Sequence, residues 1–318
     1  MKQILFVVHR YAPYPGGSEY FVRDMAEEML ARGHNVTVLA ETHQGDLNGV
    51  MVTKDYNILL QKWDLIIVHG ADVISQNIVH ANGYVINQNS PVCYMIIKPS
   101  ESAAALNGLK QHKFLAYSTQ YDIDYLKKHN VLDKARRIRH GIVYKNSLGA
   151  PTRNEDTLPH IYVSAGGFYP HKGMPPLAVA FENANIPDTQ LHLYGYGEGI
   201  IYEDTEKVKW FKGKSKQEVM FAIHNAKGYI MNSYEEGFGL VLLEAMLNHT
   251  PWYARENVGA SSDMSRYGTL YKDEDELMDI LECDPSFPSI VNSAYDYVMT
   301  NHLITQTCND IEDILNES

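Results

Sequence analysis

Short apolar runs alternate with amphipathic stretches along most of the chain, and this alternation limits the fold more than any other feature. Each apolar run has the length of a buried strand, and each amphipathic stretch has the length of a helix. Strands that alternate with helices form parallel sheets covered on both faces. We predict strands at 3–8, 35–40, 64–69, 92–98, 114–118 and 136–139 in the first half, and at 160–165, 190–194, 207–211 and 228–232 in the second.

Length and turn residues divide the predicted α/β fold into two parts. A chain of 318 residues is too long for one ordinary core and suits two Rossmann-like halves. The polar, turn-rich residues 146–159 are the best candidate for a linker. We therefore expect an N-terminal domain over residues 1–145, a C-terminal domain over 160–300, and a final helix over 301–318.

Composition argues against a membrane span, a secretion signal and a metal site. No apolar stretch approaches the ~20 residues that a membrane span needs, and the N-terminus begins with a strand rather than a charged-then-apolar leader. The three cysteines, Cys93, Cys283 and Cys308, match no zinc spacing. Asp122 and Asp124 open a predicted helix, where acidic residues are common. We expect a cytoplasmic protein without metal or cofactor.

The most informative motif is a glycine-rich turn between a strand and a helix. The apolar run 228–231 ends in turn formers, and a helical pattern begins at Gly239. Such a turn gathers unpaired backbone N–H groups at the positive end of a helix dipole, where a phosphate fits without a cationic side chain. Glu236 lies in the turn, and Glu244 lies about one and a half helical turns further on, where it can accept hydrogen bonds from a ribose diol. Two solvated surface carboxylates remain the alternative.

Four other motifs accompany this turn in a fixed order. Gly-Gly-Ser-Glu, residues 16–19, follows the first strand, and Gly-Gly-x4-Lys-Gly, residues 166–173, follows the first strand of the second half. The segments 191–197 and 208–213 come between that motif and the turn. Together with the carboxylates at 236 and 244, they resemble the retaining glycosyltransferases of family 4, which have the GT-B fold and a Glu-x7-Glu signature.

The resemblance covers most of the chain and implies both an architecture and a reaction. The fold would be two Rossmann-like parallel-sheet domains facing each other across a cleft, and the last helix could return to the N-terminal domain. The reaction would be transfer of a sugar from a nucleoside-diphosphate sugar to an acceptor hydroxyl, with retention of configuration and without a metal. The implied donor-binding residues are Gly16, Gly17, Gly167, Lys172, Lys212, Gly237, Phe238, Gly239, Leu240 and Glu244.

The expected catalytic residues are Glu236, Lys172, Lys98 and His69. The resemblance implies that Glu236 holds the transferred sugar and that Lys172 contacts the diphosphate. Lys98 is a hypothesis, because this chain has Gly167 where the family usually has an arginine and lacks the family histidine after the fourth strand. His69 ends a predicted parallel strand, where ligands gather in open α/β sheets, although a structural role remains open.

The charge of the chain is unevenly distributed. Residues 98–145 hold 10 Lys and Arg against 4 Asp and Glu, whereas the whole chain has a formal net charge of −12. Solvated helix faces would explain this basic segment, and so would a polyanionic acceptor. Three functions stay open: a retaining transferase with a glycan, lipid or small-molecule acceptor, the same chemistry on a hydroxylated base in DNA, and a nucleotide-sugar-binding module that has lost catalysis.

Overall fold

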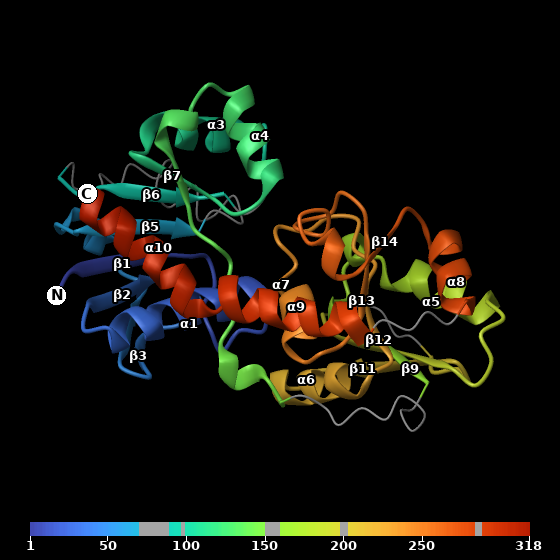
Figure 1. Ribbon diagram of the computed structural model, residues 1–318. Helices are drawn as coiled ribbons and strands as arrows, with labels where there is room; N and C mark the ends of the chain where they lie inside the picture. The colour runs from blue at the N-terminus through green and yellow to red at the C-terminus, as the bar shows by residue number, and fades with distance from the viewer. Residues whose placement is uncertain (70–88, 97–98, 150–159, 198–202, 284–287) are drawn as a thin grey trace. The chain divides into compact units, whose positions relative to one another are not determined.

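The computed structural model describes residues 1–69, 89–96, 99–149, 160–197, 203–283 and 288–318. They form two compact units, one made of Met1–Gly141 with Leu303–Ser318 and the other of Ile142–His302 (Figure 1). Each unit contains one sheet with helices packed against it, so the predicted α/β class with two Rossmann-like parallel-sheet domains is confirmed. No helix in these ranges is both long and apolar enough to cross a membrane.

The sheet of the first unit is parallel except at one edge. Within the described residues its order is β3-β4-β2-β1-β5-β6-β7-β8, and β3 pairs with β4 in the antiparallel sense. Its strands are β1 (Gln3–Val7), β2 (Asn35–Leu39), β3 (Gly45–Leu47), β4 (Val50–Thr53), β5 (Leu65–His69), β6 (Val92–Met95), β7 (Phe114–Tyr117) and β8 (Ala135–Arg137). Its α-helices are α1 (Gly17–Ala31), α3 (Ala103–Gln111), α4 (Gln120–Lys128) and α10 (Ile304–Glu317).

The central strand β1 shows why this sheet forms. Ile4, Leu5, Phe6 and Val7 are all fully buried, because a central parallel strand is covered on both faces. Short 3-10 helices, η1 (Tyr56–Leu60) and η2 (Leu132–Lys134), complete two of the connections.

The sheet of the second unit is parallel at every described pairing. Its order is β11-β10-β9-β12-β13-β14. Its strands are β9 (Ile161–Gly167), β10 (Gln190–Tyr196), β11 (Val208–Lys212), β12 (Gly228–Met231), β13 (Trp252–Arg255) and β14 (Thr269–Tyr271). Its helices are η3 (Tyr144–Asn146), η5 (Pro170–Lys172), α5 (Met174–Asn183), α6 (Lys216–Asn225), α7 (Leu240–Leu247), η6 (Ser265–Tyr267), α8 (Glu274–Glu282) and α9 (Pro288–Asn301).

The boundaries between the units differ from the predicted ones. The chain leaves the first unit after Gly141 and re-enters it at Leu303, whereas the sequence placed these points at residues 145 and 300. The start of the predicted linker is attached to the second unit, since the Leu148 N–H donates to Asn248 Oδ1 at 3.0 Å. Its remaining residues, 150–159, lie outside the described ranges.

The last helix, α10, belongs to the first unit and packs beside α1 (Figure 1). It also supplies acidic partners for the basic segment. The guanidinium of Arg139 pairs with Asp310 at 2.5 Å, and that of Arg136 pairs with Glu317 at 2.6 Å. Part of the positive charge counted in residues 98–145 is therefore neutralised by acidic side chains that the sequence places far away.

We expect Asp310→Ala to destabilise the first unit by roughly 3 kcal/mol. Asp310 has an 8% exposed side chain and accepts hydrogen bonds from both the backbone N–H and the Nε of Arg139, at 2.8 and 2.9 Å, and all of these would be lost. Urea unfolding followed by circular dichroism measures the change. Asp313→Ala is the matched control, because Asp313 is an exposed carboxylate on the same helix. Equal unfolding midpoints for the two variants would contradict the expectation.

Candidate active site

The loop that carries Lys172 is tied to the segment that carries Glu236. Gly173 follows Lys172 with φ of 64°, and a Cβ there would lie 2.2 Å from the carbonyl oxygen of Asn232. Only glycine tolerates both the left-handed backbone and this close approach. Asn232 in turn donates from Nδ2 to the Gly173 carbonyl at 2.7 Å, and the Tyr234 N–H donates to the His171 carbonyl at 2.8 Å. These contacts hold the two loops side by side at the carboxyl ends of β9 and β12.

The contact between the Lys172 loop and the segment that carries Glu236, called the junction below, brings two of the expected residues together. The ammonium of Lys172 lies 2.6 Å from Glu236 Oε1, and the hydroxyl of Ser233 donates to the same oxygen at 2.7 Å. The side chains of Lys172 and Glu236 are 21% and 16% exposed. The carboxylate is therefore fixed in position, half-buried and still reachable from solvent, as a ligand-binding group should be.

The glycine-rich turn leads directly into α7. Gly239, with φ of 90°, is the N-cap residue, and the helix begins at Leu240. A second loop supports the turn, because the Ala260 N–H donates to the Phe238 carbonyl at 2.9 Å and a Cβ on Gly259 would lie 2.6 Å from that oxygen. The first N–H groups of a helix have no intrahelical acceptor and favour an anion at this end.

Glu244 is a buried carboxylate in an apolar helix. Its side chain is 6% exposed, and Oε1 forms an ion pair with the ammonium of Lys216. Its other oxygen, Oε2, is buried and has no hydrogen-bond partner among the described residues. Burial raises the pKa of the Tyr229 phenol, and the negative charges of Glu236 and Glu244 raise it further. Both carboxylates are therefore close enough to one buried phenol to act on its ionisation.

Two other expected donor residues lie at strand ends of the same sheet. Lys212 is exposed and ends β11, and Gly213 follows it in the left-handed region with φ of 70°. Gly167 ends β9, and a Cβ there would lie 2.3 Å from the ring of Tyr169. The aromatic ring of Tyr169 thus fills the space that a side chain at position 167 would need.

In the first unit, the Gly-Gly pair begins α1. Gly16 is the N-cap residue, and a Cβ there would lie 2.0 Å from Glu19 Oε2, so the buried Glu19 carboxylate packs directly against this glycine. Glu19 also holds the guanidinium of Arg10, with Arg10 Nε 3.1 Å from Oε1. Glycine is required at position 16 for the close approach of this carboxylate.

Of the two remaining expected catalytic residues, the structure describes His69 but not Lys98. His69 ends β5, but its side chain is 1% exposed and its ring lies 6.2 Å from that of Phe21, within the core of the unit. This conformation offers His69 almost no accessible surface. Lys98 lies outside the described residues.

Polar side chains beneath the junction form a further network. Asn232 Nδ2 donates to Glu274 Oε1 at 2.9 Å, and the same oxygen lies 2.5 Å from the guanidinium of Arg255. Although burial opposes it, hydrogen bonds from Arg255 and Asn232 hold the pKa of Glu274 below its ordinary value. The Tyr234 hydroxyl donates to this carboxylate at 3.1 Å. Asn232 thus joins the Lys172 loop to a fixed ion pair.

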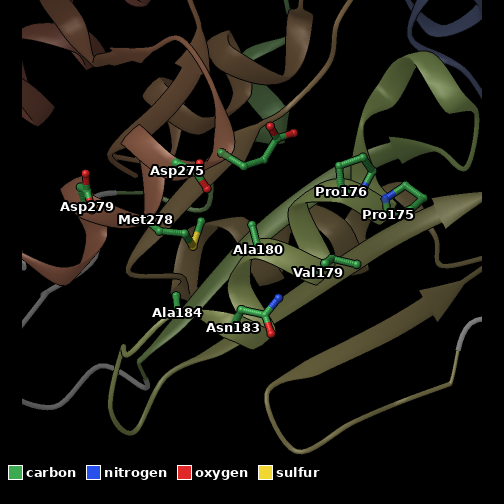
Figure 2. Close-up of a pocket in the computed structure, with 10 residues that line it drawn as sticks. Pro175, Pro176, Val179, Ala180, Asn183, Ala184, Asp275, Met278 and Asp279 are labelled. Atoms are coloured by element: carbon green, nitrogen blue, oxygen red, sulfur yellow. The ribbon is translucent and has the colours of Figure 1, made fainter.

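A groove of about 700 Å³ lies between α5 and α8 (Figure 2). Its described lining is partly apolar and partly acidic and contains none of the expected donor residues. The lining residues are Pro175, Pro176, Val179, Ala180, Asn183, Ala184, Glu274, Asp275, Met278 and Asp279. The groove is connected to the donor residues only indirectly, through Glu274 and through α5, which begins just after Lys172.

The structure gives no grouping of three His, Cys, Asp or Glu side chains suited to a metal within the described ranges. Asp122 instead caps α4, since it accepts hydrogen bonds from the backbone N–H groups of Ser118 and Thr119, both at 2.9 Å. Its neighbour Asp124 pairs with Lys127 at 3.3 Å. Both acidic residues therefore have structural partners in the first unit.

Comparison with known proteins agrees with this geometry. Residues 151–266 match the family model described as glycosyl transferases group 1. This range contains the Lys172 loop, the glycine-rich turn and both carboxylates. A search of curated proteins gave no match to the sequence.

Solved structures match the chain over its whole length. Sucrose-phosphate synthase from Thermosynechococcus elongatus has a TM-score of 0.80 at 17% identity, with 100% of this chain and 99% of the other covered. Anabaena HepE in complex with UDP and glucose has a TM-score of 0.78 at 16% identity, with 100% of both chains covered. WaaG, a glycosyltransferase involved in lipopolysaccharide biosynthesis, has a TM-score of 0.72 at 17% identity, with 99% and 100% covered.

At 16–17% identity, these structural matches show the fold alone. The chain has the two-domain GT-B fold, and its residues 151–266 match the model of the glycosyl transferases group 1 family.

We expect Gly173→Ala to disrupt the junction more than the same change at Gly213. Both glycines have positive φ, 64° and 70°, so both substitutions carry a backbone strain of about 1–2 kcal/mol. At Gly173 the new Cβ would also collide with the Asn232 carbonyl, whereas at Gly213 nothing lies within 4 Å. Urea unfolding should show a larger loss for Gly173→Ala, by at least ~1 kcal/mol. If Gly173→Ala lowered the free energy of unfolding no more than Gly213→Ala does, the junction would accommodate the added methyl group without a cost, contrary to this expectation.

Proposed function

We propose that the protein is a retaining glycosyltransferase that moves a sugar from a nucleoside-diphosphate sugar to an acceptor hydroxyl without a metal ion. The observation that carries this proposal is the Lys172–Glu236 pair, held at 2.6 Å beside the N-terminus of α7 inside the glycosyl transferases group 1 domain. The HepE structures support the donor class, since one is a complex with UDP and glucose and another a complex with UDP-glucose.

The leaving group sets the chemical task of the site. When the bond between the sugar C1 and the phosphate oxygen breaks, negative charge grows on the nucleoside diphosphate. The ammonium of Lys172 and the N–H groups of residues 237–240 at the start of α7 are fixed donors that can stabilise this charge. A cation and a helix N-terminus together replace the metal ion that would otherwise be needed.

Glu236 and Glu244 divide the remaining recognition between them. Glu236, already oriented by Lys172 and Ser233, accepts hydrogen bonds from hydroxyls of the transferred sugar and so positions C1 for attack. The acceptor oxygen bonds to C1 from the side of the leaving group, and its proton passes to the departing phosphate oxygen, which retains the anomeric configuration. Glu244 binds the ribose.

Observations on the acceptor favour a hydroxyl compound other than DNA. The basic segment that suggested a polyanion has partners within its own unit, including Asp310 and Glu317. Lys127 and Lys128 pair with Asp124 and Glu101, at 3.3 and 2.6 Å. We therefore propose a glycan, a lipid-linked saccharide or a small molecule as the acceptor.

We expect Glu236→Gln to lower turnover by about 100-fold or more, because a neutral amide loses the ion pair with Lys172 and binds the sugar less strongly in the transition state. Glu235→Gln is the matched control, since Glu235 is an exposed carboxylate one residue away. Initial rates with the donor that binds best measure the effect. Near wild-type turnover of Glu236→Gln would refute this role.

A screen of donors separates a transferase from a module that only binds nucleotide sugars. UDP, ADP and GDP and their glucose derivatives are added to the protein, and unfolding temperatures are measured. A ligand at 100 times its dissociation constant adds about 2.7 kcal/mol to the stability of the unit that binds it, which raises the unfolding temperature by several degrees. We also expect slow release of free sugar from the stabilising donor in the absence of acceptor. Stabilisation without any release would favour the binding module.

A further inference from the structure

The buried Glu244 carboxylate forms an ion pair with Lys216, and Lys216 is its only cationic partner among the described residues. It is the first residue of α6, and its position is fixed by a capping box in which the Ser215 hydroxyl accepts from the Glu218 N–H and the Glu218 carboxylate accepts from the Ser215 N–H. The side chain of Lys216 is 32% exposed, whereas that of Glu244 is 6% exposed. The ammonium therefore reaches from the buried carboxylate toward solvent.

The pairing is incomplete on both sides. Lys216 engages Oε1 of Glu244, while Oε2 is buried without a hydrogen-bond partner in the described part of the chain. A buried acceptor left without a donor is unfavourable, and one in a ligand site is expected to be satisfied by the ligand. An ammonium has three N–H donors and uses one of them in the ion pair. The site thus offers one vacant acceptor and further donors next to it.

We propose that Lys216 and Glu244 together recognise the vicinal diol of the nucleotide ribose, so that Lys216 determines specificity for ribonucleotides. One ribose hydroxyl donates to Glu244 Oε2, and its neighbour accepts from the Lys216 ammonium, since a hydroxyl can do either. This inference rests on the proposed function, which supplies the nucleoside diphosphate. It adds that the ion pair itself contacts the ligand and is more than a neutralising partner for a buried charge.

The consequence is a preference for ribose over 2′-deoxyribose. A deoxynucleotide lacks one of the two hydroxyls, so either the acceptor or the ammonium is left without its partner when it binds. Sites that are built to bond a hydroxyl discriminate strongly against ligands that lack it. If Lys216 only neutralised Glu244 and made no contact with the ligand, replacing Lys216 would leave the ratio of the affinities for the two nucleotides unchanged.

The test compares dissociation constants for UDP, ADP, GDP and their 2′-deoxy forms by calorimetry. We expect the wild-type protein to bind the best of the three ribonucleotides at least about tenfold more tightly than its deoxy form. Lys216→Met should weaken the ribonucleotide about tenfold and reduce the ratio between the two forms to about two or less. Lys214→Met is the matched control, because Lys214 lies two residues earlier and pairs with Glu218 at 3.1 Å. It should leave both constants unchanged.

A second variant covers the case in which Lys216→Met does not fold. Lys216→Gln keeps an N–H donor for the buried carboxylate, but its amide ends one atom short of the ammonium and should also lose the preference for ribose. Circular dichroism establishes that each variant is folded. An unchanged ratio in the folded variants, or an equal loss of both affinities, would overturn the proposal while leaving the proposed function intact. Failure of the wild-type protein to bind any of the three diphosphates would contradict the proposed function itself.

Discussion

The arrangement of the candidate site depends on one amide side chain, that of Asn232. It links the carbonyl of Gly173 to the carboxylate of Glu274, and its own oxygen accepts from the Tyr271 hydroxyl at 2.8 Å. The Asn232 side chain is buried, so none of these bonds competes with water. Because Lys172 precedes Gly173 directly, the amide fixes the separation between the lysine and the carboxylates that follow β12. The chemistry proposed here requires that separation to be set before a ligand arrives.

Local sequence patterns predicted the parts of this site that form locally. The alternation of strands and helices and the glycine turn before α7 depend on nearby residues, and the structure has both. The strands β13 and β14 were not predicted, because each is short and lacks the period of an isolated strand. The hairpin of β3 and β4 was missed as well. Whether such short segments become strands depends on their burial against neighbouring strands, and a single sequence does not reveal that burial.

Ion pairs between residues far apart in the sequence explain the other differences between the predicted and the observed site. Lys216 and Glu244 are 28 positions apart, and no spacing rule connects a helix start with the middle of the next helix. The acidic partners of the basic segment were not predicted for the same reason, since Asp310 lies 171 positions from Arg139. Lysine and glutamate are abundant on protein surfaces, so the residue types alone did not indicate that Lys216 and Glu244 form a partly buried pair. Only the folded chain shows which of these charges are paired and which buried acceptor, Glu244 Oε2, has no hydrogen-bond partner among the described residues.

The path of the chain between the two units has a consequence for how the protein is made. The second unit is continuous from Ile142 to His302, whereas the first needs both Met1–Gly141 and Leu303–Ser318. During synthesis the second unit can therefore complete its core while the first still lacks α10, with the helix's acidic partners and the apolar face that packs on α1. Domains generally fold as units as they emerge, usually the N-terminal one first. In this protein the order of completion would be reversed, and the first unit would remain open to chaperones or to misfolding until Leu303–Ser318 have been synthesised.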